Sequence, residues 1–392
     1  MYARIRIYGL WLGVMLLMAA CTQEERMPDI PAEAVAITFD CHTALDEGET
    51  RAANGATGFT TSENGNLYYM GLGVFARVED ATDYNFMWNQ ELEYVFLADI
   101  TQDEFDLYDG YWTYTPIKYW PYKYDNVEQK NVPKTLYFSA YAPYVEKPDG
   151  LPAGTTGITG MSASSENPYI DYTLSDKLDE TVDLLWSYLS PTSKPSVKGP
   201  VSLKMYHALA RVAVALKLSA APATDTKVLV RRITLIPTTL ATSGKLNLTS
   251  HSTFTVDENE VVVPTWSNLT MLSGEGTKGD RTILIDHDPA TTPESYCDIS
   301  NDIRLIPGLP YSWQPEGLNE TGYQNALTSE SHQAYLYFIP QDAFTVTCTV
   351  AYTVFASDGT QTPGNKTMTT AATLADPLRG NLTYHLNLTI EI

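Results

Sequence analysis

Residues 344–354 read FTVTCTVAYTV, and this stretch decides the fold class of the chain. Large apolar side chains occupy every second position, and threonine or alanine occupies the positions between them. Successive side chains of a β-strand point to opposite faces, so the pattern predicts a long strand with one buried face. Residues 382–392 and 212–218 alternate in the same way, and residues 201–205 form a shorter set.

The composition also favours strands. The 392 residues include 26 tyrosines and many threonines, which suit a pleated surface. Helical periodicity is weak, and the best helical segments are Leu174–Val182 and the short Tyr206–Ala210. The sequence therefore predicts an all-β chain built of Greek-key β-sandwiches, rather than alternating β and α units.

The charge and the length bound the partners and the domain count. A formal net charge of −22 argues against nucleic acid, whose phosphates need a basic surface. A chain of this length suggests two domains, and the proline-containing stretch Ser190–Pro195 suggests a boundary between them. We expect a leader over residues 1–21, an N-terminal domain over 22–199 and a C-terminal domain over 200–392.

The N-terminus has the features of a bacterial lipoprotein signal. Arg4 and Arg6 precede an apolar run of about 14 residues, too short for a membrane helix of about 20 residues. The run ends in Ala19-Ala20, directly before Cys21. We expect Cys21 to become the lipidated N-terminus. The acidic stretch Thr22–Glu25 that follows resembles a surface-export signal, which implies a surface-exposed outer-membrane lipoprotein. The alternative is an ordinary secretory signal that is followed by a chance cysteine.

A strand-like segment and an arginine follow this leader. Val35, Ile37 and Phe39 alternate with smaller or polar residues, so the segment can bury one face in a sandwich. A polar, glycine-containing region then leads to Arg51 and Ala52, and such a loop is accessible to a protease. An ordinary surface arginine is the alternative for Arg51.

Motifs of catalysis are missing from the sequence. It contains no Gly-x-Ser-x-Gly, no His-Glu-x-x-His and no phosphate-binding glycine loop. Asp286, His287 and Asp288 are metal-ligating residue types, but neighbours on a strand point to opposite faces, which favours a solvated loop. We therefore expect no enzyme, no metal and no cofactor.

Three cysteines remain besides the expected lipidation site: Cys41, Cys297 and Cys348. An exported chain can oxidise its thiols, and Cys297 with Cys348 is one candidate disulfide. Sequence alone does not fix the connectivity, and a buried thiol is the other interpretation for each.

Aromatic residues crowd the segment Tyr108–Tyr124. They could form an exposed platform that stacks on sugar rings, or they could pack across the strands of a hairpin. The packed arrangement is favoured because β-sandwiches use many aromatic residues in this way.

Several short motifs follow one another along the chain in an order that is typical of one protein family. They are Gly71–Ala76, Trp112–Pro121, Leu136–Pro143, Asp183–Ser187, His207–Arg211 and Arg379–Leu388. With these motifs the chain resembles the fimbrillins of Bacteroidales, the subunits of the type V pilus.

The resemblance implies two transthyretin-like β-sandwich domains, lipoprotein export, and a role in fimbriae that contributes to adhesion. For polymerising subunits it also implies that an arginine-specific protease removes the first strand, and that a strand of another subunit fills the groove. In this chain Val35–Cys41 matches the removable strand, and Arg51-Ala52 matches the cleavage site. The partners implied are other fimbrial subunits, the protease and a host protein or glycan.

Three points stay open in the sequence. The C-terminal strand, residues 382–392, could be the donated strand, or it could simply close the second domain. The chain could also be an unprocessed anchor subunit that keeps its lipid and first strand. A monomeric lipoprotein that binds glycans through Tyr108–Tyr124 is a further alternative.

Overall fold

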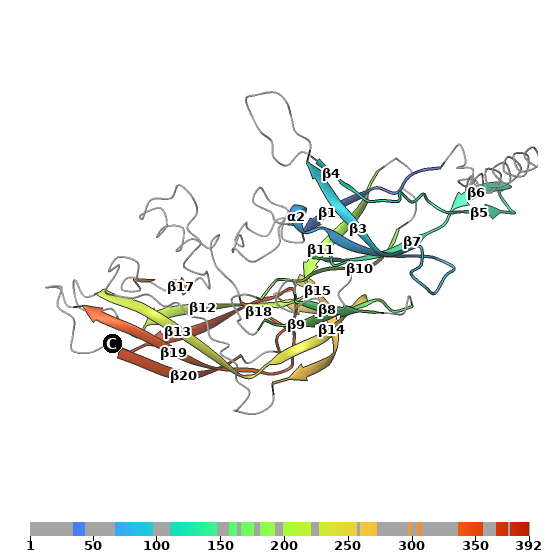
Figure 1. Ribbon diagram of the computed structural model, residues 1–392. Helices are drawn as coiled ribbons and strands as arrows, with labels where there is room; N and C mark the ends of the chain where they lie inside the picture. Colours follow the sequence, from blue (N-terminus) through green and yellow to red (C-terminus); the bar gives the residue numbers. More distant parts are fainter. Residues whose placement is uncertain are drawn as a thin grey trace, which may run out of the picture.

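Almost every described element is a β-strand (Figure 1). The structure is a computed structural model, and it describes residues 34–43, 67–96, 110–146, 157–162, 166–175, 181–192, 199–220, 227–256, 259–272, 297–298, 304–306, 336–355, 366–374 and 377–391. Within these ranges the one α-helix is the single turn α2 (Leu67–Met70). The predicted all-β class is confirmed.

Seven strands close into a ring that forms the N-terminal body. In order of pairing they are β1 (Phe39–Thr43), β11 (Val201–His207), β10 (Leu185–Thr192), β7 (Leu136–Ala142), β2 (Leu72–Val78), β3 (Met87–Phe96) and β4 (Gly110–Thr113). The ring closes because β1 also pairs with β4. Its interior is one hydrophobic cluster, which includes Ile37, Phe39, Val74, Phe138 and Leu203.

Three four-stranded sheets, which include the longest strands, form the second body (Figure 1). One sheet contains β12 (Ala210–Leu218), β17 (Arg304–Ile306), β18 (Leu336–Phe338) and β21 (Thr383–Ile390). A second contains β13 (Lys227–Thr239), β16 (Cys297–Asp298), β19 (Phe344–Phe355) and β20 (Lys366–Leu374). A third contains β8 (Ile158–Met161), β9 (Tyr169–Thr173), β14 (Ala241–Val256) and β15 (Asn259–Met271).

The alternation in residues 344–354 has the predicted consequence. The six apolar side chains on one face of β19 are all buried in a second hydrophobic cluster: Phe344, Val346, Cys348, Val350, Tyr352 and Val354. The threonines at positions 345, 347 and 349 are only half-buried. One face of this strand therefore lies in the core, as a period of two requires.

Strand pairing crosses the expected boundary after residue 199 in both directions. β11 follows that position in sequence but pairs with β1 and β10 in the N-terminal ring. β8 and β9 precede it but pair, through β9, with β14. The division into residues 22–199 and 200–392 stays a prediction. The chain leaves the ring for β8 and β9, returns to it for β10 and β11, and leaves it again at Ala208–Leu209.

The segment Ala208–Leu209 is held on several sides. The Ala208 N–H donates to Leu184 O at 2.7 Å, and the Trp266 indole N–H donates to Ala208 O at 3.1 Å. Asn381 N–H donates to Leu209 O at 3.2 Å. The weak helical pattern over Tyr206–Ala210 does not give a helix, because β11 ends at His207, β12 begins at Ala210 and the backbone groups between them bond to distant segments.

A buried contact between a histidine and an aspartate lies beside this segment and joins two of the sequence motifs. His207 Nδ1 lies 2.5 Å from Asp183 Oδ2, and both side chains are almost completely buried. The other carboxylate oxygen of Asp183 accepts the Leu184 N–H at 2.9 Å. The cross-strand pairing of Leu185 with His207 brings these motifs together. Because both groups are buried, the pair fixes strand position and is closed to a substrate.

Candidate functional site

The candidate site is the groove in the N-terminal ring that β1 fills. On one side β1 runs parallel to β11, with Phe39 opposite Val201 and Thr43 opposite Met205. On the other side Phe39 lies opposite Trp112 of β4. β1 is thus an inserted strand between two others rather than an added edge strand.

The residues just before β1 bond to the loop that follows β4. Ile37 N–H donates to Lys118 O at 2.9 Å, and Trp120 N–H donates to Val35 O at 3.0 Å. On the β11 side, Val201 N–H donates to Thr38 O at 2.7 Å. Withdrawing this segment would leave donors and acceptors unpaired along both walls of the groove.

Side chains of the segment alternate between core and solvent. Ile37, Phe39 and Cys41 are 1%, 5% and 3% exposed, whereas Thr38 and Asp40 are exposed. Val35 is half-buried and packs against the same cluster. The structure therefore places all three residues expected to fill the groove (Val35, Ile37 and Phe39) on the core-facing side.

Aromatic side chains form the wall around Phe39. Its ring centroid lies 5.6 Å from that of Tyr114 and 5.5 Å from that of Phe138, both in edge-to-face geometry. Trp120 packs edge-to-face on Phe138, at 6.3 Å. Aromatic rings favour these orientations, so the wall suits an aromatic side chain in particular.

The groove is lined mainly by buried apolar and aromatic side chains. Burial raises the pKa of the Cys41 thiol well above its usual range, with a smaller contribution from Asp40. Burial likewise raises the pKa of Tyr114 to about 12. Both groups therefore stay protonated at neutral pH.

The aromatic segment predicted as either platform or packing is mainly packing. Trp112, Tyr114 and Trp120 are 6%, 4% and 4% exposed and line the β1 groove. Tyr111, Tyr119 and Tyr124 are exposed. Tyr111 lies on β4, Tyr119 in the loop that follows β4, and Tyr124 on the separate hairpin of β5 (Tyr122–Asp125) and β6 (Lys130–Pro133). Sequence reasoning did not find that this segment forms the groove wall.

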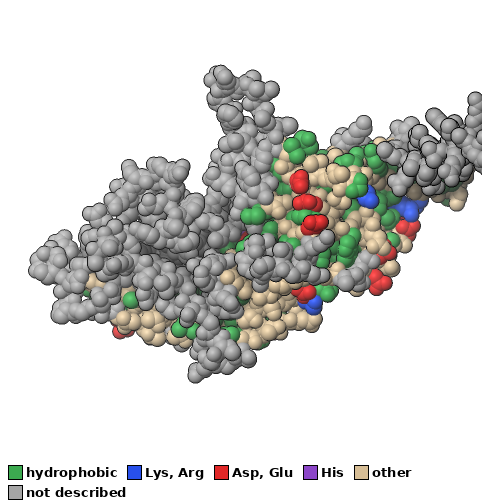
Figure 2. Space-filling view, viewed as in Figure 1, with side chains coloured by type: hydrophobic (Ala, Val, Ile, Leu, Met, Phe, Trp, Pro, Cys, Tyr) green, Lys and Arg blue, Asp and Glu red, His purple; other side chains and the backbone are tan. Residues whose placement is uncertain are grey.

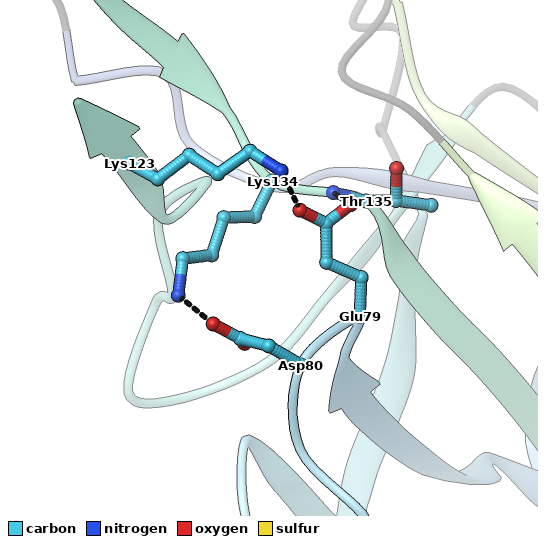
Figure 3. Close-up of polar contacts among 5 residues, drawn as sticks. All are labelled: Glu79, Asp80, Lys123, Lys134 and Thr135. Carbon is cyan, nitrogen blue, oxygen red and sulfur yellow. Dashed lines mark hydrogen bonds and ion pairs between the residues drawn. The ribbon is translucent and has the colours of Figure 1, made fainter. Parts of the chain in front are cut away.

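Two ion pairs tether that hairpin to the turn between β2 and β3 (Figure 3). Lys123 pairs with Glu79, and Lys134 pairs with Asp80 at 2.6 Å. The Lys123 hydrogen bond, followed by the bond from the Thr135 N–H, lowers the pKa of Glu79 to about 2. Because the hairpin directly continues the loop that bonds to β1, these contacts hold the groove wall in place.

The face in view in Figure 2 shows acidic and hydrophobic side chains gathered over the N-terminal body. Glu91, on β3, has its pKa raised by burial and then by the charges of Glu93 and Glu146. Across the described ranges, no group of three His, Cys, Asp or Glu side chains is placed to bind a metal ion.

The other residues singled out in the sequence have no described position. Cys21, Arg51, Ala52 and the segment Asp286–Asp288 lie outside the described residues. No helix in the described part of the chain has the length and apolar character of a membrane span.

The cysteine question is partly resolved. Cys41 and Cys348 are buried free thiols, one in each hydrophobic cluster. The structure therefore does not form the disulfide between Cys297 and Cys348 that the sequence left open.

Comparison with known proteins gives structural likenesses only. No family model matches the chain, and no curated protein does. A fimbrial protein of Bacteroides vulgatus is 18% identical with a TM-score of 0.48, covering 91% of this chain and 95% of that one. The chain thus resembles a Bacteroides fimbrial protein.

Two further solved structures are more distant. A protein of Bacteroides uniformis assigned to cell adhesion is 14% identical with a TM-score of 0.37, covering 92% of this chain and 93% of that one. Another such protein, from Bacteroides ovatus, is 12% identical with a TM-score of 0.38 and 92% coverage of both chains.

Proposed function

We propose that the chain is a structural, non-enzymatic subunit of a cell-surface fimbria, assembled when another subunit's strand replaces β1. The observation that carries the proposal is the insertion of β1 between β11 and β4 with its alternate side chains in the core. One short segment near the N-terminus thereby completes the ring. The sequence motifs shared with fimbrillins support the same role.

Removal of β1 would destabilise the N-terminal ring. Ile37 and Phe39 would each forfeit about 1.5–3 kcal/mol of burial. The backbone groups of β11 and of the loop around Lys118 would lose their partners. A strand from another molecule restores both the apolar burial and the backbone hydrogen bonds. The backbone bonds supply the affinity, and the side-chain pockets fix the register of the strand.

Processing follows from the order of features along the chain. Cys21 would hold the precursor at the outer membrane by its lipid, and cleavage between Arg51 and Ala52 by an arginine-specific protease would free the segment that carries β1. The fimbrial location and the contribution to adhesion are parts of this proposal.

The C-terminal strand has another role in this structure. β21 pairs with β12 over eight residues, from Arg211–Thr383 to Leu218–Ile390. Its Leu386, Leu388 and Ile390 are buried in the second cluster. Of the two roles that the sequence left open, this arrangement favours closure of the second body.

The structure bears differently on the two alternative functions. An anchor subunit that retains its lipid and β1 is compatible with the groove and differs only in whether Arg51 is cut. The glycan-binding lipoprotein is disfavoured, because Trp112, Tyr114 and Trp120 face the core.

Limited digestion of the purified mature chain with an arginine-specific protease tests the proposal, with Arg51→Gln as the matched control. Mass spectrometry should find cleavage after Arg51 in the wild type alone, and sizing should find heat-stable multimers after cleavage. An intact Arg51 and a persistent monomer would leave the anchor as the better account. Cleavage without multimers would contradict self-assembly.

A further inference from the structure

We propose that Tyr114 is the residue with which the groove recognises its strand: the hydroxyl fixes the strand's backbone, and the ring selects an aromatic side chain. This inference rests on the proposed function, because it names what an incoming strand must present. Tyr114 follows β4 and is 4% exposed. Its ring contacts Phe39 of β1, and its hydroxyl contacts Ile37 just before that strand.

The hydroxyl contacts only backbone groups. It donates to Ile37 O at 3.0 Å and accepts the Lys118 N–H at 3.1 Å. Since Ile37 N–H also bonds to Lys118 O, both backbone groups of that one strand residue are held. Every strand offers a carbonyl, so this contact sets position without reading sequence. A slip by one residue would turn the buried face outward.

The ring reads the side chain two residues further along. Phe39 lies edge-to-face against Tyr114 on one side and Phe138 on the other. An aliphatic side chain at this position would lose both aromatic contacts. We infer that the preferred strand runs parallel to β11 and carries an aromatic residue opposite Val201, with an apolar residue two positions earlier.

The first test measures the opening of β1 in the uncut chain by alkylation of Cys41, read by peptide mass spectrometry. Cys348 serves as the internal reference, because it lies in the other cluster. Tyr114→Phe should accelerate Cys41 labelling about fivefold, because that is the usual effect of losing one buried hydrogen bond. The acceleration should be the same whether residue 39 is Phe or Leu. Thr38→Ala, at an exposed position of the same segment, should leave labelling unchanged.

A double-mutant cycle between residues 39 and 114 tests the role of the Tyr114 ring. Phe39→Leu should accelerate Cys41 labelling about tenfold in the wild-type groove, but about threefold or less when Tyr114→Leu has already removed the aromatic contact. Equal effects in the two backgrounds, or an unchanged rate in Tyr114→Phe, would overturn the inference. If Tyr114→Leu also exposes Cys348, Phe138→Leu replaces it in the same cycle.

The second test uses the chain cut after Arg51 and synthetic peptides of residues 34–43, with Phe or Leu at position 39. The Phe peptide should be captured about tenfold better, and Tyr114→Phe should weaken both peptides equally. Capture of both peptides with equal affinity would contradict the preference for an aromatic residue at position 39, but not strand replacement. Capture of neither would contradict the proposed strand replacement, while the labelling results on the uncut chain would still stand.

Discussion

Replacing Phe39 with alanine should loosen β1 selectively. The side chain is 5% exposed and makes edge-to-face contacts with Tyr114 and Phe138. Truncation of a buried phenylalanine costs about 3–5 kcal/mol. If β1 opens alone, the substitution lowers the free energy of this local opening by the whole amount. Each 1.4 kcal/mol then multiplies the open population about tenfold.

Hydrogen exchange of the β11 amides reports this opening. The Val201 N–H is bonded to Thr38 O only while the first segment is in place. Phe39→Ala should therefore accelerate exchange in the peptide that contains Val201 at least about a hundredfold. Peptides from β19, in the other cluster, should exchange at the wild-type rate.

Two matched variants make the result decisive. Thr38→Ala changes an exposed side chain of the same segment and should not alter exchange in β11. Val350→Ala opens a cavity in the second cluster and should accelerate exchange in β19 but not in β11. Unchanged exchange at Val201 in Phe39→Ala, or equal acceleration in both bodies, would refute local release of β1.

Three further variants test contacts around the site and the passage between the two bodies. Gly73→Ala should lower the free energy of unfolding by about 2 kcal/mol in urea, because its Cβ would lie 2.2 Å from the Tyr141 ring; an unchanged stability would refute that close contact. Asp183→Ala should cost about 3 kcal/mol in the same assay, since it leaves His207 buried and unpaired, whereas paired replacement of both residues by apolar ones should recover most of the loss. Glu79→Gln should cost less than about 1 kcal/mol at neutral pH, because solvent screens the ion pair of Figure 3. The pKa of Glu79 is lowered from 4.5 to about 2, so its contribution is present above pH 4.5 and lost as the pH falls towards 2; a difference that persists at that acidity would contradict the assignment.

Periodicity predicted the strands whose two faces differ strongly. The alternation of Ile37 and Phe39 with polar residues identified the core-facing side of the first segment, as the structure has it. The same holds for β19, where each apolar residue on the buried face was identified. In both cases one face lies in the core and the other is less buried along most of its length, and the alternation of residue types records that difference.

Tyr114 could not be identified as a groove residue for a physical reason. Tyr114 has the same parity as the buried Trp112, so alternation is consistent with an inward ring, but alternation does not say which segment that ring contacts. Its partner Ile37 lies 77 residues earlier, and pairing at such separation depends on the whole ring. A parallel partner for β1 at β11 was hidden for the same reason, because β11 follows the expected boundary in sequence.

The N-terminus of the subunit in assembled fibres tests the central claim most directly. Fibres sheared from the cell surface would be dissociated, and the subunit's first residue determined by mass spectrometry. Strand replacement predicts a chain that begins at Ala52 and lacks residues 34–43. A subunit that begins at an acylated Cys21 and retains β1 throughout the fibre would contradict it.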